Sequence, residues 1–292
     1  MGIELVKKYA PATDELFAAE SKKSILTNTD YDWTGAHSVL VYKISTVAMN
    51  DYARNRFEES VIGGDNPDQN NASVQAISRY GQLCDLNAQT EEMLLKKDRS
   101  FIFNVDKLDQ DETGEAIGAD TALARQLREV VIPEVDTYTY NVMVNGAGTK
   151  AAAVELTKEN IYTQILTGTE VLDDEEVPET ERVLAVTPAT YTILKQAVEF
   201  DHTDIGAEMR LKGVVGMLDG MMVVKIPSSR LPEGFGFMIA HPSATTAPVK
   251  LEDFGTHEDT PLSSGTIVTG RIVYDAFVLD NKKKGIYYHP VA

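Results

Sequence analysis

Cysteine is almost absent from this sequence, because Cys84 is the single cysteine among 292 residues. One cysteine allows neither an intramolecular disulfide nor a zinc site built on several thiolates. Long apolar runs are also missing, and none approaches the roughly 18 residues of a membrane-spanning helix. The first residues lack the continuous apolar core of a signal peptide. We therefore expect no membrane association and synthesis in a cytoplasm-like compartment.

Basic side chains are scarce, with 27 Lys and Arg against 45 Asp and Glu and a net charge of -18. Proteins that bind nucleic acids gain most of their affinity by neutralising phosphates with Lys and Arg. This balance argues against a protein that holds nucleic acid tightly or reads its sequence. The content of 43% hydrophobic and 25% charged residues is typical of a soluble globular protein.

Motifs for catalysis and for metal binding are weak. The segment 145–150, NGAGTK, follows a helix and lacks the full spacing of a phosphate-binding loop, so its glycines are expected to cap that helix. The acidic segment 106–114 lacks the glycine and the final glutamate of a calcium loop. We predict no catalytic, cofactor-binding or metal-binding residue and no cofactor. An enzyme with its active site within residues 186–225 stays as an alternative, which turnover by the isolated protein would support.

The order of the predicted elements indicates an α+β protein in which one domain is inserted into another. Residues 1–35 are predicted to form an extended arm with a short helix at 14–21, and the polar region 45–96 to project and pair with another surface. Apolar residues at three- to four-residue spacing predict a helix over 115–144, about 45 Å long. Pro133 lies inside this helix and predicts a kink.

Three consecutive lysines, Lys282 to Lys284, lie near the end of the sequence between two apolar runs. Ala276 and Val278 precede them, and Ile286 and Tyr288 follow them, each pair at the two-residue period of a β-strand. The pair Asp280-Asn281 is typical of a turn. The pattern predicts a β-hairpin that carries the lysines at its tip.

Three stretches, in this order along the chain, carry a resemblance to a known family: KDRSFIFNVDKLDQDET, REVVIPEVDTYTYNVM and GRIVYDAFVLDNKKKGIYYH. Together they resemble the major capsid proteins of tailed bacteriophages, which have the Hong Kong 97-type fold. The resemblance implies five regions with these boundaries: 1–35, an N-terminal arm; 36–100, a strand and the projecting E-loop β-hairpin; 101–150, a peripheral domain with a long spine helix; 151–255, an inserted mixed α/β axial domain; and 256–292, returning peripheral-domain strands.

The resemblance also implies a function. Copies of the chain would self-assemble into pentamers and hexamers that form an icosahedral head shell around double-stranded DNA, in the virion of a tailed phage or prophage. Expected partners are the chain itself, a portal and decoration proteins. A separate scaffolding protein is expected because the sequence starts with a short arm. The protein would be made in the bacterial host cytoplasm. An encapsulin-type nanocompartment shell that encloses cargo enzymes is the alternative.

Candidate contact residues between subunits are basic. Lys282, Lys283 and Lys284 are expected to meet carboxylates of adjacent subunits, and the alternative is a solvated tip that keeps an edge strand from aggregating. The basic residues of the projecting region are further candidates: Arg54, Arg56 and Arg79. No lysine occurs between Ser45 and Leu95. Some relatives join their subunits by an isopeptide bond from an E-loop lysine, and we expect none here.

Overall fold

The computed structural model describes residues 19–31, 33, 38–44, 46–49, 51–52, 88–112, 118–197, 214–258 and 264–292. The chain divides into two compact units. The smaller unit is Ser38–Met93, and the larger one comprises Met1–His37 and Leu94–Ala292. Most of the predicted E-loop, including Arg54, Arg56 and Arg79, therefore lies outside the described residues. Among the described residues, no helix combines the length and the apolar character needed to cross a bilayer.

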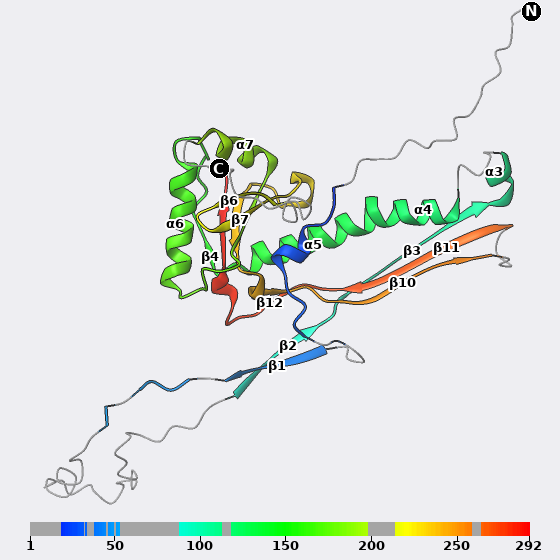
Figure 1. Ribbon diagram of the computed structural model, residues 1–292. Helices are drawn as coiled ribbons and strands as arrows, with labels where there is room; N and C mark the ends of the chain where they lie inside the picture. Colours follow the sequence, from blue (N-terminus) through cyan, green and yellow to red (C-terminus); the bar gives the residue numbers. More distant parts are fainter. Residues whose placement is uncertain are drawn as a thin grey trace, which may run out of the picture. The chain divides into compact units, whose positions relative to one another are not determined.

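A long helix runs through the larger unit (Figure 1). It consists of α4 (Ala119–Gln126), a π-helical turn η2 (Leu127–Val131) and α5 (Ile132–Gly146). The predicted helix is confirmed from residue 119 onward, and residues 115–117 lie outside the described part. Pro133 cannot donate a backbone hydrogen bond, and its ring would crowd the carbonyl four residues earlier. The wider π turn directly before it accommodates the missing donor, and the kink expected at Pro133 stays a prediction.

A three-stranded antiparallel sheet lies alongside this helix (Figure 1), with the strand order β10-β11-β3. Its strands are β3 (Lys97–Asp106), β10 (Val249–His257) and β11 (Gly265–Tyr274). Side chains alternate between the two faces along β3, since Val105 is buried and Ile102 is exposed. Val135 of the helix packs with Ile272 and Tyr274 of β11. The helix therefore covers one face of the sheet, and the face that carries Ile102 is exposed along β3.

A six-stranded sheet forms the main core, in the order β4-β13-β8-β5-β7-β6. Its strands are β4 (Thr149–Lys150), β5 (Val183–Val186), β6 (Val214–Leu218), β7 (Met221–Lys225), β8 (Phe235–Ala240) and β13 (Ile286–Pro290). The two helices α6 (Ile161–Asp174) and α7 (Pro188–Gln196) cover one face, and α5 with α1 (Lys23–Leu26) packs on the other. Burial on both faces explains why β5 reads as the continuous apolar run VLAV.

The hairpin predicted around the three lysines is wrong. The first run forms β12 (Phe277–Val278), which pairs with β9 (Thr245–Thr246), whereas the second run forms β13 in the six-stranded sheet. A 3-10 turn, η5 (Lys283–Gly285), lies between them. Alternating residues specify a strand but do not specify its partner. Here β13 has apolar neighbours on both faces, which a two-stranded hairpin could not supply.

Two segments pair differently from the expected grouping of residues 151–255 and 256–292. Most of β10 lies in the first range but the strand pairs with β11, and β13 lies in the second range but pairs with β4 and β8. The chain thus passes between the two sheets more than once. The other strands and helices of this region, β5, α6, α7, β7 and β8, all belong to the six-stranded sheet and the two helices that cover it.

The smaller unit contains a two-stranded sheet of β1 (Ser38–Ile44) and β2 (Ala88–Leu94). The strand expected at the start of the region 36–100 is β1. Lys43 and Glu91 form an ion pair with a nitrogen-to-oxygen distance of 3.0 Å, which joins the two strands. In the N-terminal arm, residues 19–21 are not helical, and the short helix is α1 instead of the predicted 14–21. Residues 14–18 lie outside the described part.

Candidate functional site

Among the described residues, no group of three or more His, Cys, Asp or Glu side chains is placed to hold a metal ion. The polar side chains of the larger unit instead form two kinds of arrangement. Some are buried networks that join segments distant in the sequence. Others are exposed groups that can contact another molecule.

A buried ion pair anchors the N-terminal arm. The Arg230 guanidinium lies 2.8 Å from the Asp136 carboxylate of α5 and also donates to the carbonyl of Ala19 at 2.6 Å. The Ser21 hydroxyl donates to the same carboxylate at 2.6 Å. Burial raises the pKa of Asp136, while the hydrogen bond from Ser21 and the charge of Arg230 oppose that rise. The arm, the long helix and the turn η3 (Ser228–Arg230) are thereby fixed to one another.

A second buried network joins the long helix to the three-stranded sheet. The Asp275 carboxylate accepts from the backbone N–H of Lys96 at 2.8 Å and from the Tyr138 hydroxyl at 2.7 Å. Burial and this hydrogen bond both raise the pKa of Tyr138. Burial also raises the pKa of Tyr274 to about 12, and the Glu134 carboxylate beside it contributes. The hydroxyls of Tyr138 and Tyr274 therefore stay protonated near neutral pH and act as fixed hydrogen-bond donors that support the helix.

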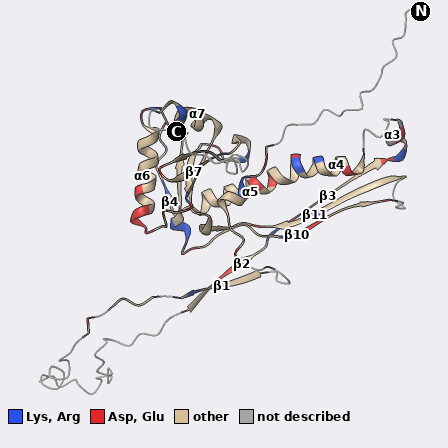
Figure 2. Ribbon diagram, in the orientation of Figure 1, with Lys and Arg blue, Asp and Glu red and all other residues tan. Residues whose placement is uncertain are grey.

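The three candidate lysines lie on an exposed turn just before β13. Lys284 forms an ion pair with Glu175, directly after α6. Lys282 and Lys283 have no ionic partner among the residues that the structure describes. Figure 2 shows this blue segment beside the red end of α6. The lysine cluster is therefore partly neutralised within its own chain and partly open to another molecule.

The glycines before β4 have a different role from the one predicted. Gly146 ends α5, but neither Gly146 nor Gly148 has a positive φ, and the C-cap is Ala147 with φ -56 and ψ 130. A Cβ on Gly148 would lie 2.5 Å from the carbonyl oxygen of Lys283. The Gly148 N–H donates to that same oxygen at 2.9 Å. Gly148 allows the close approach of the lysine turn, Gly146 allows the close approach of Val278, and neither forms a left-handed cap.

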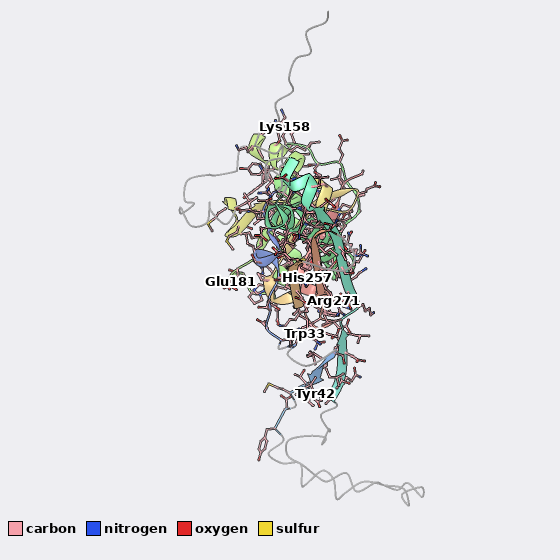
Figure 3. The ribbon with its side chains drawn as sticks, turned by 90° about the vertical axis from the view of Figure 1, so that its right-hand side faces the viewer. Trp33, Tyr42, Lys158, Glu181, His257 and Arg271 are labelled. Carbon is pink, nitrogen blue, oxygen red and sulfur yellow. The ribbon has the colours of Figure 1, made fainter. Side chains whose placement is uncertain are left out.

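An apolar stripe lies on the smaller unit. Leu40, Tyr42 and Ile44 alternate along one face of β1, and their exposed fractions are 59%, 70% and 63%. Figure 3 labels Tyr42 on this strand. The alternation was visible in the sequence, but the sequence does not say which face of the strand stays open. A soluble protein rarely leaves such a row of large apolar side chains uncovered without a use for it.

Comparisons with solved structures show the fold. The structure described as Mycobacterium phage Che8 has a TM-score of 0.73 and 16% identity, and covers 98% of this chain and 97% of that chain. The capsid of the Cyanophage P-SCSP1u has a TM-score of 0.71 and 13% identity, and the match covers 99% of this chain and 93% of that chain. The mature capsid of bacteriophage PhiM1 has a TM-score of 0.68 and 13% identity, and the match covers 99% of this chain and 92% of that chain. The fold is thus the Hong Kong 97-type fold of tailed-phage capsids, as predicted.

A family model for phage capsid proteins matches residues 90–288, which is more than half of the chain. The chain therefore belongs to the phage capsid protein family. No curated protein matches the sequence. The protein is a structural, non-enzymatic component of a capsid shell, and its place is the virion. The prediction from the three sequence stretches is confirmed at this level.

Proposed function

We propose that copies of this chain assemble into pentamers and hexamers, and that these form an icosahedral head shell around double-stranded DNA of a tailed phage or prophage. The observation that carries the proposal is the exposed apolar stripe of β1. Leu40, Tyr42 and Ile44 lie on a sheet of only two strands, and such a ribbon is marginally stable by itself. A neighbouring copy that covers the stripe would stabilise both the ribbon and the assembly.

Burial of this stripe would contribute to the free energy of association. Complete burial of one fully exposed large apolar side chain contributes about 1.5–3 kcal/mol. The exposed parts of three such side chains, repeated at every contact between subunits, would offset part of the cost of immobilising the subunits. The proposal therefore needs no ligand or cofactor.

The charge of the chain agrees with a container for DNA. A net charge of -18 repels phosphates, so the inner surface would not bind the packaged DNA tightly or by sequence. A portal, a separate scaffolding protein and decoration proteins are the further partners that we propose, with synthesis in the host cytoplasm. A nanocompartment shell that encloses cargo enzymes is the second candidate, and the content of purified shells separates the two.

Electron microscopy of the purified protein, together with light scattering on a size-exclusion column, tests the proposal. We expect rings of five and six copies, or closed shells, and DNA inside shells from infected cells. Substitution of Leu40, Tyr42 and Ile44 by Ser should abolish these assemblies. Leu166→Ser, at an exposed position of α6, is the control and should leave them intact. Monomers that stay apart in the presence of the proteins from neighbouring phage genes would overturn the proposal.

Covalent cross-links through the E-loop are not expected in these shells. From Ser45 to Leu95 the sequence contains no lysine that could form an isopeptide bond. A denaturing gel of mature shells should therefore show one band at the mass of the monomer, 32.1 kDa. A ladder of multimers would contradict this expectation.

A further inference from the structure

We propose that the lysine turn and the acidic end of α6 are the two halves of one interface between copies of this chain. Lys282 and Lys283 of one copy would bind Asp174 and Glu176 of a second copy. This inference rests on the proposed self-assembly and adds to it the residues that pair and the partner that they fit.

The lysine turn is rigid. The Lys282 N–H donates to the carbonyl of Leu279, and the Gly285 N–H donates to the carbonyl of Lys282, each at 2.9 Å. The Lys283 carbonyl accepts from Gly148, as described above. These bonds fix the backbone while the side chains of Lys282 and Lys283 stay exposed. The ordered backbone limits the entropy lost on binding to that of the two side chains, which favours recognition.

The end of α6 carries negative charge against two local preferences. The residues 173–176 are all acidic, and they occupy the C-terminal end of a helix, where the macrodipole favours cations. Glu176 also has φ 56, the left-handed conformation in which glycine is usual. Its N–H donates to the carbonyl of Asp173, and the Val177 N–H donates to the carbonyl of Leu172. A glycine at position 176 would satisfy this cap with less strain, so the fold alone does not explain a glutamate there.

Contacts within the chain neutralise only half of this acidic run. The Arg182 guanidinium lies 2.7 Å from the Asp173 carboxylate, and Lys284 pairs with Glu175. Asp174 and Glu176 are exposed, and neither has an ionic partner in the described part of the chain. Two carboxylates and two ammonium groups therefore stay unpaired on the same part of the larger unit.

Complementary charge identifies the second copy as the partner. Each copy presents both a cationic pair and an anionic pair, and the ion pair of Lys284 with Glu175 shows that the two groups lie next to each other. In a ring, the cationic pair of each copy can meet the anionic pair of the next one, so every charge finds a partner. Nucleic acid is a poorer candidate, because the neighbouring carboxylates would repel its phosphates.

Charge reversal tests this interface in the full-length protein. Variant one carries Lys282→Glu and Lys283→Glu, and variant two carries Asp174→Lys and Glu176→Lys. Each variant alone juxtaposes like charges at the interface, so we expect its shell yield to fall about ten-fold or more. When the two variants are expressed together, alternating copies restore opposite charges at each contact. We then expect six-membered rings to reappear, whereas odd-numbered rings cannot alternate.

Controls separate this inference from the proposed function. A variant with Lys158→Glu and Lys195→Glu carries the same change in net charge as variant one, at other exposed positions, and should assemble like the wild type. If the wild type forms shells and variants one and two form them in the same yield, the proposed interface is overturned but the proposed function is not. Failure of the mixture to restore rings would overturn the pairing between copies. Failure of the wild type to assemble under all conditions would overturn the proposed function itself.

A single substitution gives an independent readout. Glu176→Gly removes both the left-handed strain and one carboxylate, so we expect a higher melting temperature together with a lower shell yield. Asp219→Gly is the matched control, because Asp219 is also exposed and has φ 49. It should leave the shell yield unchanged. A Glu176→Gly protein that assembles as well as the wild type would remove Glu176 from the interface.

Discussion

The six-stranded sheet and the three-stranded sheet of the larger unit use their faces differently. Helices pack on both faces of the first sheet, and its central strands β5 and β8 are fully buried. The second sheet has the long helix on one face only. Its other face bears the exposed Ile102 and an ion pair between Arg271 and Asp98 (Figure 3 labels Arg271). The first sheet is covered on both faces within one chain, whereas the second keeps an exposed face.

Among the substitutions considered, loss of the buried ion pair between Arg230 and Asp136 should lower the stability of the chain most. Arg230→Ala leaves the Asp136 carboxylate buried without its cation, and breaking a buried pair in this way costs about 3–5 kcal/mol. We expect the free energy of unfolding, measured by denaturant titration, to fall by that amount. Replacing both partners, Arg230→Met with Asp136→Leu, should restore most of the loss. A loss below about 1 kcal/mol in Arg230→Ala would show that the ion pair contributes little to fixing the arm, the long helix and η3 to one another.

Equivalent truncations should affect the two sheets unequally. Leu184→Ala, at a fully buried position of β5, is expected to lower the free energy of unfolding by about 2–5 kcal/mol. Ile102→Ala, on the open face of β3, should change it by no more than about 0.5 kcal/mol in the isolated chain. Denaturant titration of both variants measures the difference. Equal losses would mean that the open face is packed within the chain.

Acid should weaken the six-stranded sheet through His289. This side chain is fully buried against the Phe237 ring, with 4.9 Å between ring centroids, and neither ring nitrogen has a hydrogen-bond partner among the described residues. Burial lowers the pKa of His289 below its usual value of 6.5. The unfolded chain therefore binds a proton more readily than the folded chain, so this contribution to stability is complete above about pH 6.5 and decreases as the pH falls.

The variant His289→Phe isolates that effect. At pH 7 its melting temperature should be close to that of the wild type. Between pH 7 and pH 5 its melting temperature should fall less than that of the wild type. His257→Phe is the control, because His257 is exposed on β10 and should leave the pH profile unchanged. An identical pH profile in wild type and His289→Phe would refute the assignment.

The smallest effect is expected at the exposed ion pair of the open face. Arg271 and Asp98 form two hydrogen bonds, which lower the pKa of Asp98, but both side chains are solvated. Arg271→Gln should therefore leave the melting temperature of the isolated chain almost unchanged. A marked decrease would show that this face contributes to stability without neighbours.

Much of the fold follows from local patterns in the sequence. The run VLAV gives the buried strand β5, and the apolar spacing gives α6 and the long helix. Strand partners do not follow in the same way, because β12 and β13 carry the same alternation but belong to different sheets. The site is harder still to predict. The exposed row on β1 depends on which face has a neighbour, and the left-handed Glu176 lacks the glycine that usually marks such a position.

The position of β13 has a consequence for the synthesis of the protein. This strand lies between β4 and β8, and among the described strands it is the only partner of β4. The main core therefore cannot close until residues 286–290 have left the ribosome, although the other strands emerge long before. A chain released too early would leave β4 and one edge of β8 unpaired. Unpaired strand edges pair readily with other chains, so we expect such a product to aggregate.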